Sequence, residues 1–138
     1  MAKYSVVSGN WEGYFEYGIE YQCAGERVRF QLKLEEFDYG QFRGECTELE
    51  GVGVNTEVAT IEGFMEADFI NFTKTYPSPN KDEFGNEIKG HYLIIYTGNY
   101  DWHTMSFSGA WEILSFNEVD INGNMLTTGD GKWKMSRI

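Results

Sequence analysis

The stretch "VRFQLKLEEF", residues 28–37, gives the clearest indication of the fold class. Its apolar and polar side chains fall on opposite faces of an extended chain, with Val28, Phe30, Leu32 and Leu34 against Arg29, Gln31, Lys33 and Glu35. A period of two residues is typical of a strand that has one face in a core and the other in water. The segment therefore predicts a half-buried antiparallel β-strand.

Weaker alternation of the same kind recurs along the chain and predicts eight strands, at 11–17, 28–37, 41–47, 58–65, 69–76, 92–100, 104–113 and 126–137. Short turns separate most of them, including "DYGQ" from Asp38 and "DINGN" from Asp120, whose Asn-Gly pair favours a type I′ hairpin. Short links make consecutive strands neighbours, and closure into a barrel removes exposed edges. We expect an all-β protein: one domain, residues 1–138, folded as an eight-stranded antiparallel up-and-down β-barrel, with helix below about 10% of residues.

Glycine follows a large residue by two positions in "FRGEC", "IEGFM", "YTGNY" and "FSGAW". Glycines inside strands mark bends or close approach, so these should shape a strongly coiled barrel and leave space beside aromatic rings. The pattern S-G-x-W-E also occurs twice, at residues 8–12 and 108–112. We interpret this repeat as recurring barrel geometry and not as a duplicated site.

The composition limits the classes of partner. With 22 acidic and 11 basic residues among 138, the chain has a formal charge of -11, which disfavours nucleic acid and anionic membrane surfaces. No run is long and apolar enough for a membrane span, and the N-terminus lacks the features of a secretory signal. If Met1 is the native start, the expected location is the cytoplasm, where Cys23 and Cys46 would be reduced.

Catalytic and metal motifs are scarce. His91 and His103 have no metal-binding spacing, and no nucleotide fingerprint is present. The segment "EVDINGN" resembles the start of a calcium loop, but Gly129 stands where the bidentate acid belongs, so we interpret it as a hairpin turn. The sequence predicts no cofactor, no metal and no catalytic residue.

Gly9-x-Trp11 at the start of the first strand resembles the G-x-W motif of the lipocalins and their calycin relatives. In that family the tryptophan closes one end of the barrel beneath a basic residue of the last strand. Arg137 shares strand parity with Trp133 and Met135, so it fits that role if they face inward. The resemblance implies a cation-π contact between Arg137 and Trp11.

The segment "YTGNYDWHTMSFSGAW", residues 96–111, resembles a hairpin of the avidin and streptavidin type, which leads to a ligand-stacking tryptophan. The chain length also suits this type, since it leaves no room for the added helices of longer relatives. The asparagine, serine and tyrosine set that grips biotin in that family has no matching motif in the first three strands. The resemblance therefore implies a small barrel with a ligand other than biotin.

A candidate site comes from "FINFTKTYP", where Lys74 is in register with the apolar residues Ile70 and Phe72. One interpretation is that Lys74 lies at the rim and extends its ammonium to water. The other is that Lys74, Tyr96 and Trp111 form the polar end of an interior pocket. The expected pocket residues are Phe30, Lys74, Tyr96, Trp111 and Trp133. Ring faces and one ammonium would suit an aromatic or apolar small molecule that carries a carboxylate or other anionic group.

Two other functions stay open. A solidly packed barrel would serve as a protein-interaction or inhibitor module, as some calycin-like barrels do, and would engage its partner through an acidic face or residues 78–89. A small enzyme would use a pocket acid such as Glu62 or Asp130 for proton transfer. An interior cavity above about 300 Å³ would favour ligand binding or catalysis, and a filled interior would favour the interaction module. The sequence leaves the oligomeric state open.

Overall fold

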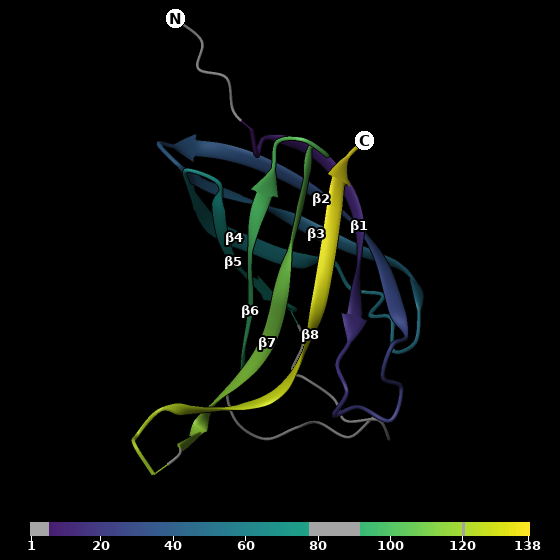
Figure 1. Cartoon of the computed structure of the whole chain (residues 1–138), viewed down its shortest axis with the longest axis vertical. Coiled ribbons are helices and arrows are strands. Elements are labelled where there is room, and N and C mark those ends of the chain that lie inside the picture. The colour runs from purple at the N-terminus through teal and green to yellow at the C-terminus, as the bar shows by residue number, and fades with distance from the viewer. Residues whose placement is uncertain (1–5, 78–91, 120) are drawn as a thin grey trace, which may run out of the picture.

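The computed structural model describes residues 6–77, 92–119 and 121–138. They form eight antiparallel strands in one closed barrel, and each strand pairs with its neighbours in sequence (Figure 1). The strands are β1 (Gly9–Tyr17), β2 (Arg27–Asp38), β3 (Gln41–Gly51), β4 (Ala59–Glu66), β5 (Phe69–Thr75), β6 (Tyr92–Asp101), β7 (Ser106–Val119) and β8 (Met125–Arg137). The predicted all-β, up-and-down barrel is confirmed, and the described residues include no helix.

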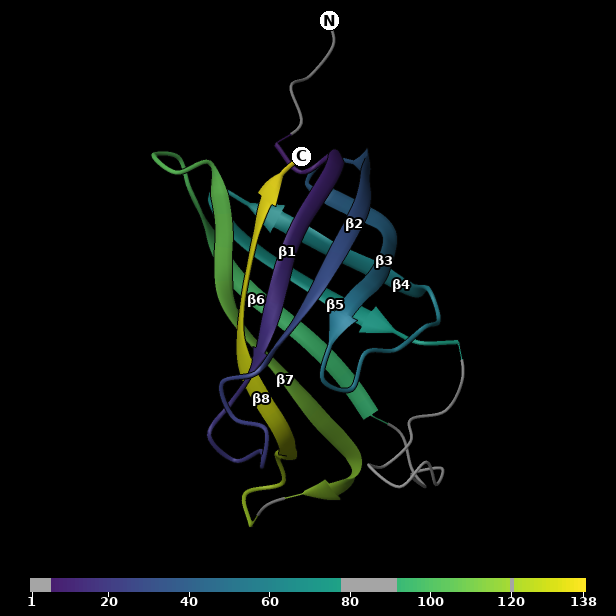
Figure 2. The ribbon, with the colours of Figure 1, turned by 90° about the vertical axis from the view of Figure 1, so that its right-hand side faces the viewer.

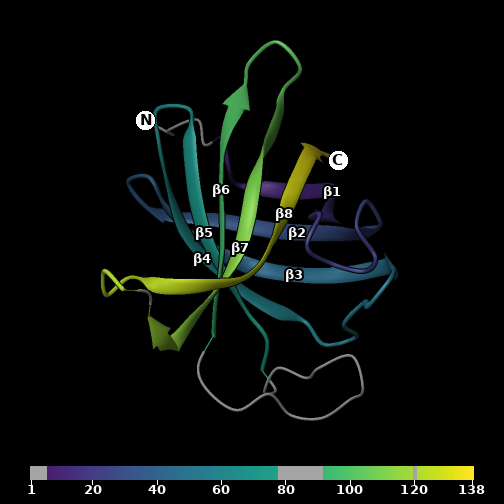
Figure 3. The same ribbon diagram turned by 60° about the horizontal axis from the view of Figure 1, so that its bottom comes forward.

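The predicted strand bounds agree closely with the structure. The main differences are at two C-terminal ends, where β3 continues to Gly51 and β7 to Val119, past the predicted ends at 47 and 113. The extended β7–β8 hairpin projects beyond the barrel, at the end away from the C-terminus (Figure 2). Strands β2 and β3 cross β6 to β8 at a large angle, as the tilted strands of a small barrel do (Figure 3).

Closure of the barrel joins β1 to β8, with paired residues running from Trp11 and Arg137 to Tyr17 and Gly131. This pairing defines two ends. At the Trp11 end, β1 begins and β8 ends. At the loop end, β1 ends and β8 begins, and residues 18–26 and 52–58 connect β1 to β2 and β3 to β4.

The interior is built from the apolar faces of all eight strands. The predicted inward face of residues 28–37 is confirmed, because Val28, Phe30, Leu32 and Leu34 are at most 3% exposed. Aromatic rings pack along the barrel: Trp11 lies 5.1 Å from Phe107 at one end, and Phe72 stacks 4.8 Å from Tyr96 nearer the middle, as measured between ring centroids.

The expected pair at the Trp11 end is also confirmed. Trp11 is fully buried, and the Arg137 guanidinium carbon lies 4.6 Å from the centroid of its indole ring. Arg137 donates hydrogen bonds to the carbonyl oxygens of Ser8, at 2.5 Å, and Val6. The indole N–H of Trp11 donates to the carbonyl oxygen of Val7 at 2.8 Å. Arg137 thus fixes the chain that precedes β1 across the end of the barrel.

Glycines lie where neighbouring strands approach most closely. Gly98 and Gly109 face one another across β6 and β7, and a Cβ at Gly109 would stand 1.9 Å from the carbonyl oxygen of Thr97. A Cβ at Gly98 would also stand 3.0 Å from the Trp133 ring. The predicted role of these glycines, close approach beside an aromatic ring, is confirmed at this pair.

A bulge in β3 changes which residues face the interior. Arg29 pairs with Glu50 and Phe30 pairs with Glu48, so Leu49 is an extra residue on β3. Strict alternation would place Glu48 and Glu50 on the same face. The bulge instead leaves Glu48 in the interior and lets Glu50 contact Arg29 on the outside, at 2.6 Å.

Among the residues that the structure describes, no helix is long and apolar enough to cross a membrane. Several residues discussed above lie outside the described part, namely His91, Asp120 and the whole of residues 78–89. The predicted partner-binding role of 78–89 therefore stays a prediction.

Candidate functional site

The candidate site centres on Lys74, whose side chain points into the barrel near the loop end. Alternation along β5 places Lys74 on the same face as Ile70 and Phe72, and it is 4% exposed. Its Nζ lies 3.0 Å from the hydroxyl oxygen of Tyr96 and 3.5 Å from Oε2 of Glu48. The alternative in which Lys74 lies at the rim and reaches water is therefore wrong.

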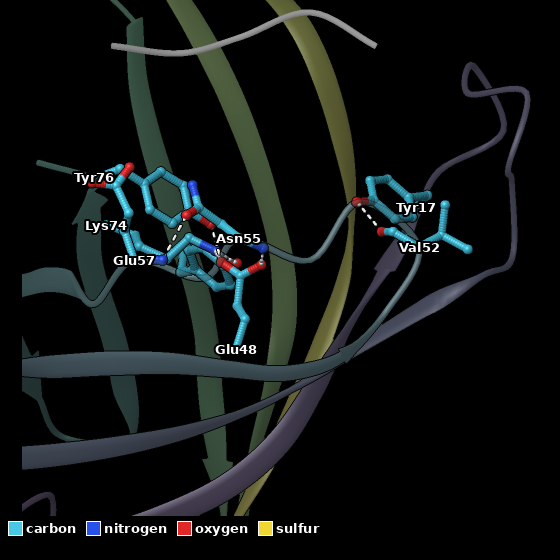
Figure 4. Close-up of polar contacts among 8 residues, drawn as sticks. Tyr17, Glu48, Val52, Asn55, Glu57, Lys74 and Tyr76 are labelled. Carbon is cyan, nitrogen blue, oxygen red and sulfur yellow. Dashed lines mark hydrogen bonds and ion pairs between the residues drawn. The ribbon is translucent and has the colours of Figure 1, made fainter. Parts of the chain in front are cut away.

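Glu48 connects this buried ammonium to the loop that follows β3 (Figure 4). Its Oε2 faces Lys74 and accepts a hydrogen bond from the hydroxyl of Tyr76. Its Oε1 accepts a hydrogen bond from the backbone N–H of Asn55 at 3.0 Å. The Asn55 side chain accepts the N–H of Glu57 at 2.8 Å and so shapes the loop. One carboxylate therefore holds both the ammonium and residues 52–58.

Aromatic faces surround the ammonium. The Nζ of Lys74 lies 4.4 Å from the ring centroid of Phe15 and 5.2 Å from those of Tyr76 and Tyr96. Ring faces carry negative charge density, so these contacts stabilise a desolvated cation. The site thus combines one cation, one anion and two phenolic hydroxyls among aromatic rings.

The side chains nearer the loop end are only half-buried. Tyr17, Tyr21, Tyr76, Ile94 and Ile113 pack against the core but keep part of their surface exposed. The hydroxyl of Tyr17 donates to the carbonyl oxygen of Val52 at 2.7 Å and so joins β1 to residues 52–58 (Figure 4). The charged group therefore lies just beneath a rim of partly exposed aromatic and aliphatic side chains.

Burial sets the protonation of the site. Burial alone would lower the pKa of Lys74, but the Tyr96, Tyr76 and Glu48 oxygens outweigh it and raise this pKa well above its usual value. Burial raises the pKa of Tyr96 to about 12 and that of Cys46 to about 11. Burial also raises the pKa of Tyr76. Near neutral pH the ammonium is charged and the hydroxyls keep their protons; Tyr76 donates to Glu48, and Tyr96 accepts from Lys74.

The other predicted site residues form the wall of the interior. Phe30 pairs with Glu48 across β2 and β3, and Trp133 lies 5.7 Å from Tyr96, measured between ring centroids. Trp111 lies further from the ammonium: its indole N–H donates to the carbonyl oxygen of Glu16 at 3.1 Å. Its ring packs against Phe15, Tyr17 and Tyr21. Lys74 and Tyr96 are in direct contact, and a role in binding stays a prediction for all five.

Sequence reasoning missed Glu48 and Phe15. Glu48 has the parity of Phe42 and Cys46, which both face inward, and this was the available signal. The signal was lost because β3 was expected to end at 47. Phe15 lies on the inner face of β1 with Trp11, and its ring joins Lys74 to Trp111.

The acids proposed for catalysis are poorly placed for it. Glu62 is exposed, because Ile61 takes the inner face of β4, so the prediction that Glu62 is a pocket acid is wrong. Asp130 is half-buried and pairs with Glu112 between β7 and β8. In the described part of the chain, no group of three or more His, Cys, Asp or Glu residues is arranged to hold a metal ion.

A separate, open groove of about 640 Å³ lies on the outer surface near β1 and β2. Its lining includes Glu12, Tyr14, Arg27, Arg29 and Glu50. Arg29 is already held between Glu12 and Glu50, and Arg27 lies 3.1 Å from Glu16, so both cations of the groove are already paired with carboxylates. The interior around Lys74 is the stronger candidate site.

The chain thus defines a small closed barrel with a buried, ring-lined ion pair. No family model matches the sequence, and no curated protein matches it. Among solved structures it is similar to EF1p2_mFAP2b bound to DFHBI, with a TM-score of 0.61 over 96% of this chain and 94% of that chain. The two sequences are 12% identical, so the likeness shows the fold alone. Membership of the calycin, lipocalin or avidin group stays a prediction.

Proposed function

We propose that this protein binds a small aromatic or apolar molecule that carries a carboxylate or another anionic group. The binding site is the interior near the loop end, where Lys74 and Tyr96 contact the anionic group and the surrounding rings contact the apolar part. Phe30, Trp111 and Trp133 belong to the wall of this site. One observation carries the proposal: a charged ammonium is held inside a barrel among ring faces.

Energetics support a functional role for this group. Taking an ammonium and a carboxylate out of water is costly, and an apolar pair of similar volume often gives equal or greater stability. The ion pair of Lys74 and Glu48 is therefore poorly explained by stability alone. A binding pocket, by contrast, needs a few fixed polar groups among apolar walls. A similar barrel was solved with DFHBI bound, which supports the capacity of this fold to hold a small molecule.

A protein-interaction module is the second candidate, and the close packing of interior rings favours it. Phe72 contacts both Tyr96 and Trp133, and the distances between ring centroids are 4.8 and 5.4 Å. Rings in such contact leave little space between them. In this second function the interior is only structural, and no small anionic aromatic molecule binds there.

Tryptophan fluorescence separates the two functions. Trp102 is 62% exposed, whereas Trp11, Trp111 and Trp133 are at most 4% exposed, so Trp102→Phe leaves a signal that comes from the interior. This variant is titrated with 2-naphthoate and with the uncharged 2-naphthamide. We expect a saturable change with both and a lower Kd for 2-naphthoate. No change with either compound contradicts ligand binding.

The role of Lys74 needs a variant that leaves no buried charge unpaired. Lys74→Met alone strands Glu48, so the double variant Lys74→Met with Glu48→Gln is the appropriate test. We expect it to bind 2-naphthamide as before and to lose the preference for 2-naphthoate. Lys132→Met, on the exposed outer face of β8, is the matched control and should keep that preference.

A further inference from the structure

Glu48 occupies the position that the anionic group of a ligand would need. Its Oε2 faces the Lys74 ammonium and accepts from the Tyr76 hydroxyl, and Lys74 in turn contacts Tyr96. Lys74 and Tyr76 are thus two donors that bind one anion, and that anion is already a side chain of the protein. The inference below rests on the proposed function and specifies how the same site works.

We propose that Glu48 is an internal counterion that the carboxylate of the ligand replaces, and that Glu48 takes up one proton from solvent when this happens. The ligand carboxylate then contacts Lys74 and Tyr96, as in the proposed function, and also accepts from the Tyr76 hydroxyl that Glu48 releases. Glu48 becomes a neutral carboxylic acid. The protein therefore binds the ligand anion together with a proton. The class of ligand is an aromatic or apolar monocarboxylate.

Charge balance is the reason for the proton. The side chain of Glu48 is 2% exposed and that of Lys74 is 4% exposed, so the pair lies away from water. A second carboxylate beside one ammonium would leave a net negative charge in the interior, and an unpaired buried charge is very costly. Protonation of Glu48 restores one anion to one cation. The protonated acid also gains an O–H that can donate to the incoming carboxylate.

Among the residues that the structure describes, the other titratable groups that face Glu48 do not take up or release a proton near neutral pH. The titratable groups that face it are Lys74 and Tyr76 from β5 and its end, Tyr96 from β6, Tyr17 from β1 and Cys46 from β3. The pKa of each is raised, so each stays protonated through the neutral range. The proton that is taken up on binding therefore goes to Glu48 and not to one of these neighbours.

Replacement of Glu48 by the ligand also affects residues 52–58 at the loop end. Glu48 Oε1 holds the backbone N–H of Asn55, and Tyr17 holds the carbonyl oxygen of Val52, so residues 52–58 are fixed by two hydrogen bonds from the barrel. When Glu48 leaves Lys74 and becomes neutral, its charge-assisted bond to Asn55 weakens. The loop beside the site is therefore loosened by the same event that admits the anion.

The test measures binding of 2-naphthoate to the full chain as a function of pH. Uptake of one proton lowers the affinity about tenfold for each unit of rising pH, between about pH 6 and 8, where the probe itself stays ionised. Calorimetry in two buffers with different heats of ionisation counts the protons directly and should give about one per bound anion. The uncharged 2-naphthamide should show no pH dependence and no proton uptake.

Glu48→Gln keeps the shape of the side chain without the charge. We expect this variant to bind 2-naphthoate more tightly than the unaltered chain at about pH 8, with no slope against pH and no proton uptake. Glu50→Gln, at the exposed glutamate two positions on, is the matched control and should keep the slope and the proton uptake. If Glu48→Gln folds poorly, the pH dependence and proton uptake of the unaltered chain still test the inference.

The outcomes distinguish this inference from the proposed function. If 2-naphthoate binds without pH dependence or proton uptake, Glu48 is not replaced and the inference is overturned, while ligand binding stands. If Glu48→Gln binds the anion more weakly and the slope persists, another group takes the proton, which also overturns it. If neither probe binds, the proposed function fails and the inference fails with it.

Discussion

The indole of Trp111 fills the space that a side chain at Gly131 would need: a Cβ there would lie 2.5 Å from the indole Nε1. The same Cβ would stand 1.9 Å from the carbonyl oxygen of Glu16, the group that accepts the indole N–H. We therefore expect Gly131→Ala to lower the free energy of unfolding by about 1 to 3 kcal/mol, as overpacking does. Urea denaturation measures this. Lys132→Ala, exposed on the same strand, should change it by less than about 0.5 kcal/mol.

The two partners at the Trp11 end should differ strongly in their effect on stability. Trp11 is fully buried, so Trp11→Ala should lower the free energy of unfolding by about 3 to 5 kcal/mol. Arg137 is exposed, and methionine keeps most of its apolar stem, so Arg137→Met should cost about 1 to 2 kcal/mol, from the loss of an exposed cation-π contact and of the hydrogen bonds to Ser8 and Val6. Chemical denaturation of both variants measures the two losses in the free energy of unfolding. Equal losses would mean that Arg137 contributes as much to the stability of this end as the buried ring does, which would contradict the prediction.

The Lys74 and Glu48 pair should show strong coupling in a double-mutant cycle. Lys74→Met leaves an uncompensated buried carboxylate and should lower the free energy of unfolding by about 3 to 5 kcal/mol. The double variant with Glu48→Gln should recover much of this loss, since no buried charge is left unpaired. Denaturation of the two single variants and the double variant gives the coupling energy. Additive losses would show that the two side chains act independently.

Stability should fall steeply in alkali. The pKa of Tyr17, Tyr21 and Tyr96 is raised to about 12, and that of Cys46 to about 11, because burial disfavours their ionised forms. The unfolded chain ionises these groups near their ordinary pKa values of 10.0 and 9.0, so it loses protons before the folded chain does. Their contribution is thus complete below about pH 9 and is lost as pH rises towards 12.

The contribution of Lys74 is lost in the same direction, because its raised pKa keeps it protonated in the folded chain above the ordinary lysine pKa of 10.5. Urea midpoints measured from neutral pH into alkali, with tyrosinate absorbance followed in parallel, check this. Unfolding and the ionisation of the buried tyrosines should coincide. Full stability well above pH 10 would contradict the burial of these groups.

Residues 52–58 should loosen when the Tyr17 hydroxyl is removed. Tyr17→Phe deletes the hydrogen bond to the Val52 carbonyl, and a single bond of this kind contributes about 0.5 to 1.5 kcal/mol. We expect faster amide hydrogen exchange in 52–58 and little change in β6 or β8. Tyr14→Phe, which keeps the ring beneath Arg27, is the control and should leave exchange in the loop unchanged.

The sequence predicted the fold well because alternation and turn residues are local signals. The apolar face of residues 28–37 and the inward glycines followed from parity along single strands. The pair of Trp11 and Arg137 followed from the resemblance to the lipocalin G-x-W motif, together with the parity of Arg137. The candidate site was predicted in part. Lys74 and Tyr96 were expected together and are in contact.

Glu48 was missed although its parity with Phe42 and Cys46 indicated the inner face, because β3 was expected to end at 47. Alternation alone could not predict the outer position of Glu50, because the bulge at Leu49 moves it to the other face. A bulge depends on how β3 pairs with β2, which is not a property of either strand alone. The placement of Glu62 was misjudged for a simpler reason: its neighbour Ile61 competes for the inner face of β4 and takes it.

The seam between β1 and β8 has a consequence for the order in which the chain folds. It joins Trp11 to Arg137 across almost the whole sequence, whereas every other pairing in the barrel joins strands that are consecutive. Contacts between distant segments form slowly, since a long loop must first close. During synthesis the first seven strands can pair in turn, but β1 and β7 stay open edges, prone to pairing with other chains, until β8 has been made. The last strand therefore ends the period in which this protein is exposed to aggregation.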